Sequence, residues 1–148
     1  MKHPYLLLCL LLLPITMSAQ RGLHIADVLD GRYKKNVNTT DIVIKGGQLE
    51  EFHLTYYHSL TVENDNAIMD AIASAFIADE QAAQDKEVAH TGQQLYYGFY
   101  RLEYDGKTNR YVFFKDQRYA PGKKSLRVML IYMEGYASLS FLKKKFKK

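Results

Sequence analysis

Apolar and polar residues alternate with a period of two between Phe52 and Glu63. Successive side chains of a strand point to opposite faces, so this alternation predicts a strand with one core face and one solvent face. Because twelve residues are long for one strand, we expect a bend near His58 and Ser59. The parity assigned to the core consists of Phe52, Leu54, Tyr56, His58, Leu60 and Val62.

Three further strands are predicted between residues 94 and 136, where the turn dipeptides Asp105-Gly106 and Pro121-Gly122 interrupt long apolar runs. In these runs both alternating sets of residues, and therefore both faces of each predicted strand, are apolar. Such a pattern is typical of strands covered on both faces, or of strands that leave one face free for a contact. The polar stretch Asp85–Gly92 ahead of them is interpreted as a linker. Upstream, the β-branched run Thr40–Lys45 predicts another strand.

Helical periodicity marks three other segments. The run Ala67–Gln84 is the longest, and the residues before it offer helix N-caps: Asn64, Asp65 and Asn66. Its apolar stripe consists of Ile68, Ile72, Ala75 and Phe76. The stretch Leu23–Asp30 predicts a short amphipathic helix. Near the C-terminus, Ser138 can cap a last helix, whose apolar face consists of Leu139, Leu142 and Phe146.

The predicted elements follow in the order α-β-β-α-β-β-β-α, and hairpin turns dominate the second half. The sequence therefore predicts one α+β domain over residues 20–148. Its sheet is mostly antiparallel with about five strands, and its helices pack on one face. Gly98 stands inside one of these strands, where a glycine predicts a bulge or the close approach of another segment.

Residues 1–19 have the layout of a secretory signal peptide, with a short basic start, the apolar run Tyr5–Leu13 and small residues up to Ala19. Cleavage there would leave Gln20 as the N-terminus and remove Cys9, the single cysteine. Cys9 lies inside the leucine run, which does not favour lipidation. We therefore expect an exported protein, periplasmic or secreted, with no thiol and no transmembrane segment after signal removal.

Positive charge is concentrated at the C-terminus. Without Lys2, the chain has 19 basic and 16 acidic side chains, and five of the basic ones stand in the last six residues. The body before this Lys-rich helix has 14 basic and 16 acidic side chains, so the high isoelectric point does not indicate nucleic-acid binding. The tail is interpreted as a solvated helix end, with docking on anionic lipid or polysaccharide as the alternative.

Reactive side chains form no recognised motif. Four histidines follow the signal (His24, His53, His58 and His90), but His53 and His58 fall on opposite faces of a strand, and none has metal-ligand spacing. No G-x-S-x-G sequence occurs. The adjacent carboxylates Asp79 and Glu80 are expected to be solvated. The sequence therefore predicts no catalytic residue, no metal site and no cofactor.

Tyrosines are the strongest candidate for a binding surface, because tyrosine suits places that are apolar at one end and wet at the other. Two interpretations stay open. The tyrosines are half-buried strand residues, as β-propensity alone would place them, or one parity forms an exposed platform for an envelope protein, a glycan or a second copy of the chain. The residues of this candidate face are Tyr96, Tyr100 and Tyr104, with Tyr111 or Tyr132 beside them.

Two functions follow from these observations. The leading hypothesis is a non-enzymatic binding module that uses the aromatic sheet face. The alternative is a small hydrolase-type enzyme in which His53 or His58 acts with a nearby carboxylate.

Four segments also carry a family resemblance. They are GLHIADVLDGRYKKN (22–36), LYYGFYRL (95–102), TNRYVFFK (108–115) and LIYMEGYASL (130–139). Together they resemble an uncharacterised family of small exported proteins, a domain of unknown function typical of Bacteroidota. The resemblance implies a bacterial envelope or secreted location, and it brings no activity, ligand or catalytic residue with it.

Overall fold

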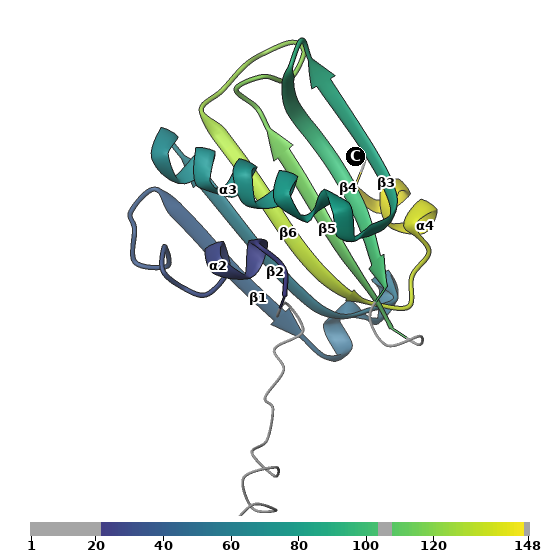
Figure 1. Cartoon of the computed structure of the whole chain (residues 1–148). Helices are drawn as coiled ribbons and strands as arrows, with labels where there is room; N and C mark the ends of the chain where they lie inside the picture. The colour runs from purple at the N-terminus through teal and green to yellow at the C-terminus, as the bar shows by residue number, and fades with distance from the viewer. Residues whose placement is uncertain (1–21, 104–107, 147–148) are drawn as a thin grey trace, which may run out of the picture.

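Six antiparallel strands form one sheet in the computed structural model, which describes residues 22–103 and 108–146 (Figure 1). Across the sheet the strands follow the order β1-β2-β6-β5-β4-β3. The predicted α+β class with a mostly antiparallel sheet is confirmed. The strands are β1 (Thr39–Lys45), β2 (Leu54–Glu63), β3 (Ala83–Thr91), β4 (Gln94–Glu103), β5 (Asn109–Asp116) and β6 (Arg127–Gly135).

The edge strand β3 is the element that the sequence pattern did not predict, and the interpretation of residues 85–92 as a linker is wrong. This strand pairs only with β4, and its register shifts twice, between Ala83 and Asp85 and between Ala89 and His90. All its side chains are at least partly exposed, so no hydrophobic alternation is required of it. Bulges and charged side chains are typical of a sheet edge that is protected from further pairing.

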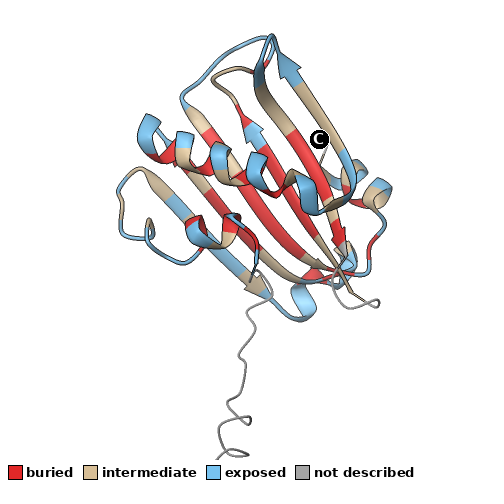
Figure 2. Ribbon diagram, in the orientation of Figure 1, coloured by how far each residue is buried: buried red, intermediate tan, exposed pale blue. Residues whose placement is uncertain are grey.

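Two helices cover one face of the sheet, as Figures 1 and 2 show: α2 (Ile25–Val28) and α3 (Asn66–Ala78). The predicted cap of α3 is confirmed, because the Asp65 carboxylate accepts a hydrogen bond from the Ile68 amide at 3.1 Å. The helix ends at Ala78, and the short 3-10 turn η2 (Asp79–Ala82) leads directly into β3. Three side chains of α3 are fully buried: Met69, Ile72 and Phe76. They pack against strand residues of the same core, which are Leu60, Tyr100, Leu102, Phe114 and Leu130.

The opposite face carries α4 (Leu139–Phe146) and the 3-10 helix η1 (Gly47–Phe52), so the expectation that helices pack on one face is wrong (Figure 1). The physical reason lies in the central strands, which are apolar on both parities and need a cover on each side. Ser138 caps α4 as predicted, accepting a hydrogen bond from the Phe141 amide at 3.1 Å. This second core consists of Leu49, Leu54, Phe99, Tyr111, Phe113, Ile131, Met133, Ala137 and Leu142.

Three boundaries differ from those predicted. The helix α3, predicted to reach Gln84, ends at Ala78. Residues 47–52 form η1, so β2 begins at Leu54, and its register against β6 shifts between Leu54 and Tyr56 rather than near His58. The first helix spans only Ile25–Val28. The predicted signal peptide, residues 1–19, and the predicted turn at 105–106 lie outside the described residues. Among the helices of the described chain, none has the length and apolar character that crossing a bilayer requires.

Candidate functional site

The tyrosines of the candidate face do not lie on one exposed surface. Tyr100, Tyr111 and Tyr132 are fully buried. Tyr100 and Tyr132 belong to the core beneath α3, whereas Tyr111 belongs to the core beneath α4. Tyr96 is half-buried and Tyr104 lies outside the described residues. The platform interpretation is therefore wrong for the three buried tyrosines, because helices cover both faces of the strands that carry them.

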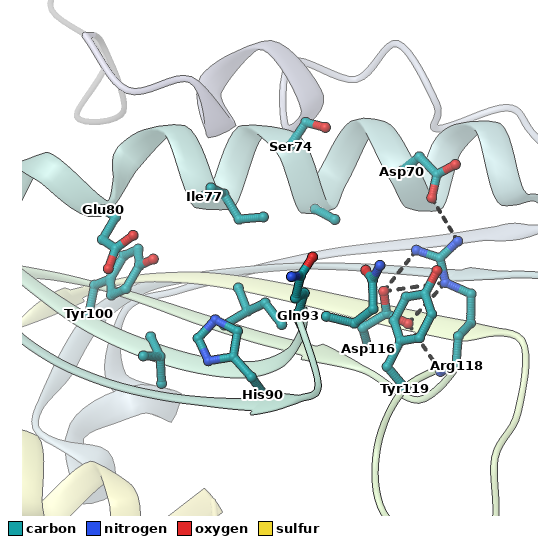
Figure 3. Close-up of a pocket in the computed structure, with 14 residues that line it drawn as sticks. Asp70, Ser74, Ile77, Glu80, His90, Gln93, Tyr100, Asp116, Arg118 and Tyr119 are labelled. Carbon is teal, nitrogen blue, oxygen red and sulfur yellow. Dashed lines mark hydrogen bonds and ion pairs between the residues drawn. The ribbon is translucent and has the colours of Figure 1, made fainter.

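The best-defined concave feature is a cleft of about 420 Å³ beneath α3, which we call the α3 cleft. Its walls are α3, the hairpin of β3 and β4, and the chain that leaves β5 (Figure 3). The volume is within the range of small-molecule sites. The labelled residues that line it are Asp70, Ser74, Ile77, Glu80, His90, Gln93, Tyr100, Asp116, Arg118 and Tyr119.

Tyr100 forms the inner wall at one end of the α3 cleft. Its ring is stacked on that of Phe76, with 4.2 Å between the centroids, and its residue exposure is 0%. The hydroxyl makes no hydrogen bond with any described residue. Burial, and then the negative charges of Glu80 and Asp79, raise the pKa of this hydroxyl, so it stays protonated at neutral pH. Tyr100 lines the cleft, where its hydroxyl can both donate and accept a hydrogen bond.

Gly98 explains how these two rings fit. A Cβ atom at this position would lie 2.4 Å from Cε1 and Cζ of Phe76. The glycine therefore lets the Phe76 ring approach the backbone of β4, which is the close approach that the sequence predicted. The Phe76 ring in turn supports Tyr100, so the sheet backbone sets the position of the inner wall.

Arg118 forms the opposite end of the cleft and is already fully engaged. Its guanidinium donates to Asp116 through Nε and Nη2, at 3.0 and 2.8 Å, and to Asp70 through Nη1 at 2.8 Å. These hydrogen bonds, first of all those to Asp116, raise the pKa of Arg118. Tyr119 packs against the guanidinium, 5.2 Å from ring centroid to Cζ. This end therefore ties α3 to the end of β5 (Figure 3).

Sequence reasoning missed most residues of the α3 cleft. Asp70 and Arg118 are 48 positions apart and meet only through the fold. Asp116 and Arg118 are only two positions apart. This local pair of opposite charges was the one feature of the cleft that the sequence could have indicated. The expectation of solvated carboxylates is wrong for Asp79, which is 3% exposed. Its neighbour Glu80 is half-buried and lines the cleft.

A histidine–carboxylate pair exists, but away from the cleft. His58 Nε2 and Asp41 Oδ1 are 2.8 Å apart, and each side chain is only 7% exposed. Neither residue lines the α3 cleft. His53 stacks on Phe141 and Tyr136, with 4.5 and 5.5 Å between centroids, and acts as a packing residue between η1 and α4. Within residues 22–103 and 108–146, no three metal-ligating side chains gather as an ion would require.

The face that carries α4 has a smaller apolar groove of about 290 Å³. It lies between β1, η1 and α4 and is lined by Ile42, Ile44, Leu49, Phe52, Leu54, Tyr57 and Phe146. Two lysines of α4 make contacts elsewhere on this face. Lys143 pairs with Glu87 of the edge strand β3, and the Lys145 ammonium lies over the rings of Phe52 and Phe141. The part of the tail that the structure describes is therefore more than a solvated end.

Comparisons with known proteins place the chain at the level of a family. Searches of curated proteins and of solved structures found no match. A family model described as "Family of unknown function (DUF6108)" matches residues 12–146. The resemblance to an uncharacterised family is confirmed to this extent. Since the match covers most of the sequence, the protein belongs to this family of unknown function, DUF6108.

Proposed function

We propose that this protein is an exported, non-enzymatic binding module that takes a small polar ligand in the α3 cleft. The observation that carries the proposal is the α3 cleft itself, a concave surface of about 420 Å³ lined by the polar side chains of Tyr100, His90 and Gln93. A pocket with an apolar floor and a few convergent polar groups is the usual form of a small-molecule site.

The binding proposal is favoured over the hydrolase alternative by the position of the histidines. A general base must reach its substrate directly or through one water. The His58–Asp41 pair is buried between strands, and His53 is stacked between aromatic rings. His90 lines the cleft, but no carboxylate is hydrogen-bonded to it in the described chain. The cleft therefore offers recognition without an oriented base.

Export is proposed on the layout of residues 1–19, and it has a direct test. When the full chain is produced in a bacterium with its secretion system intact, the periplasmic protein should begin at Gln20 and lack Cys9. Intact-mass spectrometry of the purified protein measures this. Retention of residues 1–19 in the mature protein would contradict the export proposal, and a mass increase from acyl chains on Cys9 would show lipidation instead.

Filling the α3 cleft should abolish ligand binding without unfolding the protein. Ile77 lines the cleft and is 49% exposed, so the Ile77→Trp variant adds bulk there with little loss of core packing. Saturation-transfer NMR with a mixture of amino acids, monosaccharides and short aliphatic amines measures binding. We expect signals from at least one compound with the wild-type protein and none with the variant.

The matched control is Ala78→Trp, because Ala78 is the next residue on the same helix, is exposed and does not line the cleft. This variant should bind as the wild type does. Binding that survives Ile77→Trp, or an absence of signal from every compound with the wild-type protein, would count against the α3 cleft as a site.

A further inference from the structure

We propose that two copies of the protein form a symmetric dimer through their β1 strands, which pair edge to edge in antiparallel orientation. The inference goes beyond the proposed function, because the α3 cleft lies at β3 and β4, toward the other edge of the sheet. Three features carry it: the contrast between the two edges, the direction of the β1 backbone groups, and the order of charged and apolar side chains along β1.

The two edges of the sheet differ in how they are protected. The outer strand β3 has two register shifts and the charged run Asp85–Glu87. By contrast, β1 pairs with β2 over all its seven residues without a register shift, and within the described chain no strand pairs with its other side (Figure 1). Its side chains Ile42 and Val43 are 44% and 46% exposed. A regular, apolar edge of this kind is the usual template for the addition of another strand.

The backbone groups of alternate β1 residues point away from the sheet. The Glu63 N–H donates to the Asn38 carbonyl at 2.9 Å, and these two residues stand opposite each other in the register of β1 and β2. In an antiparallel ladder, every second residue turns both of its backbone groups toward the same neighbour. The even-numbered residues therefore point to β2, whereas Asp41, Val43 and Lys45 point outward and can bond to a second copy.

The charges of β1 select one register for pairing with itself. A two-fold axis at Val43 sets Asp41 of each copy opposite Lys45 of the other, which gives two pairs of opposite charge. An axis at Asp41 or at Lys45 would set like charges opposite each other, which destabilises a sheet. An axis at Ile42 or Ile44 would set valine opposite a charged residue. The register at Val43 also joins three outward-pointing residues of each copy, and thus about six backbone hydrogen bonds.

The same register covers apolar surface on the face that carries α4. Ile42 and Ile44 line the apolar groove together with Phe52 and Phe146. In the dimer, Ile42 of one copy stands opposite Ile44 of the other, in the closer, non-hydrogen-bonded type of pair. The isoleucines of the second copy therefore lie along the open side of the groove. Such an interface uses one self-complementary patch twice, as two-fold symmetry requires.

Sedimentation equilibrium tests the dimer and the role of charge. Because one added strand buries less than a standard interface, we expect monomer at roughly 1 µM and mostly dimer at roughly 200 µM. Lys45→Asp sets aspartates opposite each other twice and should weaken dimerisation at least about tenfold. Lys124→Asp, an exposed lysine between β5 and β6, makes the same change of charge away from β1 and should leave the dimer unchanged.

Disulfide cross-linking tests the register. In a Cys9→Ala background, Val43→Cys places the only thiol of each copy on the two-fold axis, where opposite Cα atoms lie about 5.5 Å apart, within the range that a disulfide spans. Mild oxidation should therefore link the two copies. Thr40→Cys is the control, because this exposed residue lies three positions from the axis and its two copies are about 20 Å apart.

Hydrogen exchange at low and high protein concentration reports the proposed backbone bonds directly. The amides of Asp41, Val43 and Lys45 should gain protection as the dimer forms. Those of Ile42 and Ile44 already point to β2 and should change little.

Three results would overturn the proposal. A wild-type protein that stays monomeric at roughly 200 µM does not pair with itself, and its β1 edge is then left to a strand of another protein. Equal dimerisation by Lys45→Asp and Lys124→Asp would contradict the register that charge selects. Cross-linking of Thr40→Cys as fast as that of Val43→Cys would contradict it as well. Thermal melts of each variant confirm that it is folded.

Discussion

Gly98→Ala should lower the free energy of unfolding by about 1–3 kcal/mol, although it adds a single methyl group. The new Cβ would lie 2.4 Å from two carbon atoms of the Phe76 ring. That ring cannot move aside, because it is fully buried between Tyr100 and Phe114, with centroid distances of 4.2 and 4.8 Å. Urea unfolding followed by circular dichroism measures the change.

A second glycine provides the control for this prediction. Gly47 has no atom within 4 Å of the position of an added Cβ, and its φ is not in the left-handed region. Gly47→Ala should therefore leave the stability unchanged or raise it slightly, by reducing the freedom of the unfolded chain. A loss in Gly98→Ala no larger than the effect of Gly47→Ala would contradict the proposed clash.

The clash can also be separated from a general loss of backbone freedom. In a Phe76→Leu background, the smaller side chain leaves room for a Cβ at position 98, so the added cost of Gly98→Ala should fall. The difference is a coupling energy between the two positions. Because the Phe76 ring also supports Tyr100 in the wall of the α3 cleft, the single Gly98→Ala variant should weaken the binding that the NMR mixture detects, whereas Gly47→Ala should not.

Local patterns predicted most of the fold, because most elements depend on their own residues. The alternation before Glu63 gave β2, and the stripe and cap of residues 65–78 gave α3. The strand β3 escaped prediction because an edge strand is held by hydrogen bonds to one neighbour and needs no buried face of its own. The face of the sheet on which α4 packs is likewise set by tertiary packing. A helix with one apolar stripe can pack against either face of a sheet, so its own sequence does not specify the face.

The site was less predictable, for a related reason. A tyrosine in a strand has the same local preference whether its face meets a helix or water, so the sequence could not distinguish Tyr100 from an exposed residue. Similarly, Asp79 and Glu80 are adjacent carboxylates, yet one is buried beneath α2 and the other lines the cleft. What separates them is the direction of the turn that ends α3, which depends on packing.

Asp79→Ala should lower the free energy of unfolding by about 2–4 kcal/mol, and it should release the first segment of the domain before the rest. The buried carboxylate accepts hydrogen bonds from the backbone N–H groups of His24 and Ile25, at 2.7 and 2.9 Å, and lies 2.9 Å from the His24 ring. Alanine would leave those N–H groups without acceptors. The helix that they begin, α2, has only four residues and is too short to be stable alone.

Hydrogen exchange distinguishes the release of α2 from global unfolding. Amides of residues 23–29 should lose protection in Asp79→Ala, while those of β5 and β6 keep theirs. Asp30→Ala is the matched control, because Asp30 also binds a neighbour, Arg32, but both side chains are about half exposed. An exposed pair contributes at most about 1 kcal/mol. If the two variants lose equal stability, the burial of Ile25 and Leu29, rather than the Asp79 carboxylate, holds α2 on the sheet.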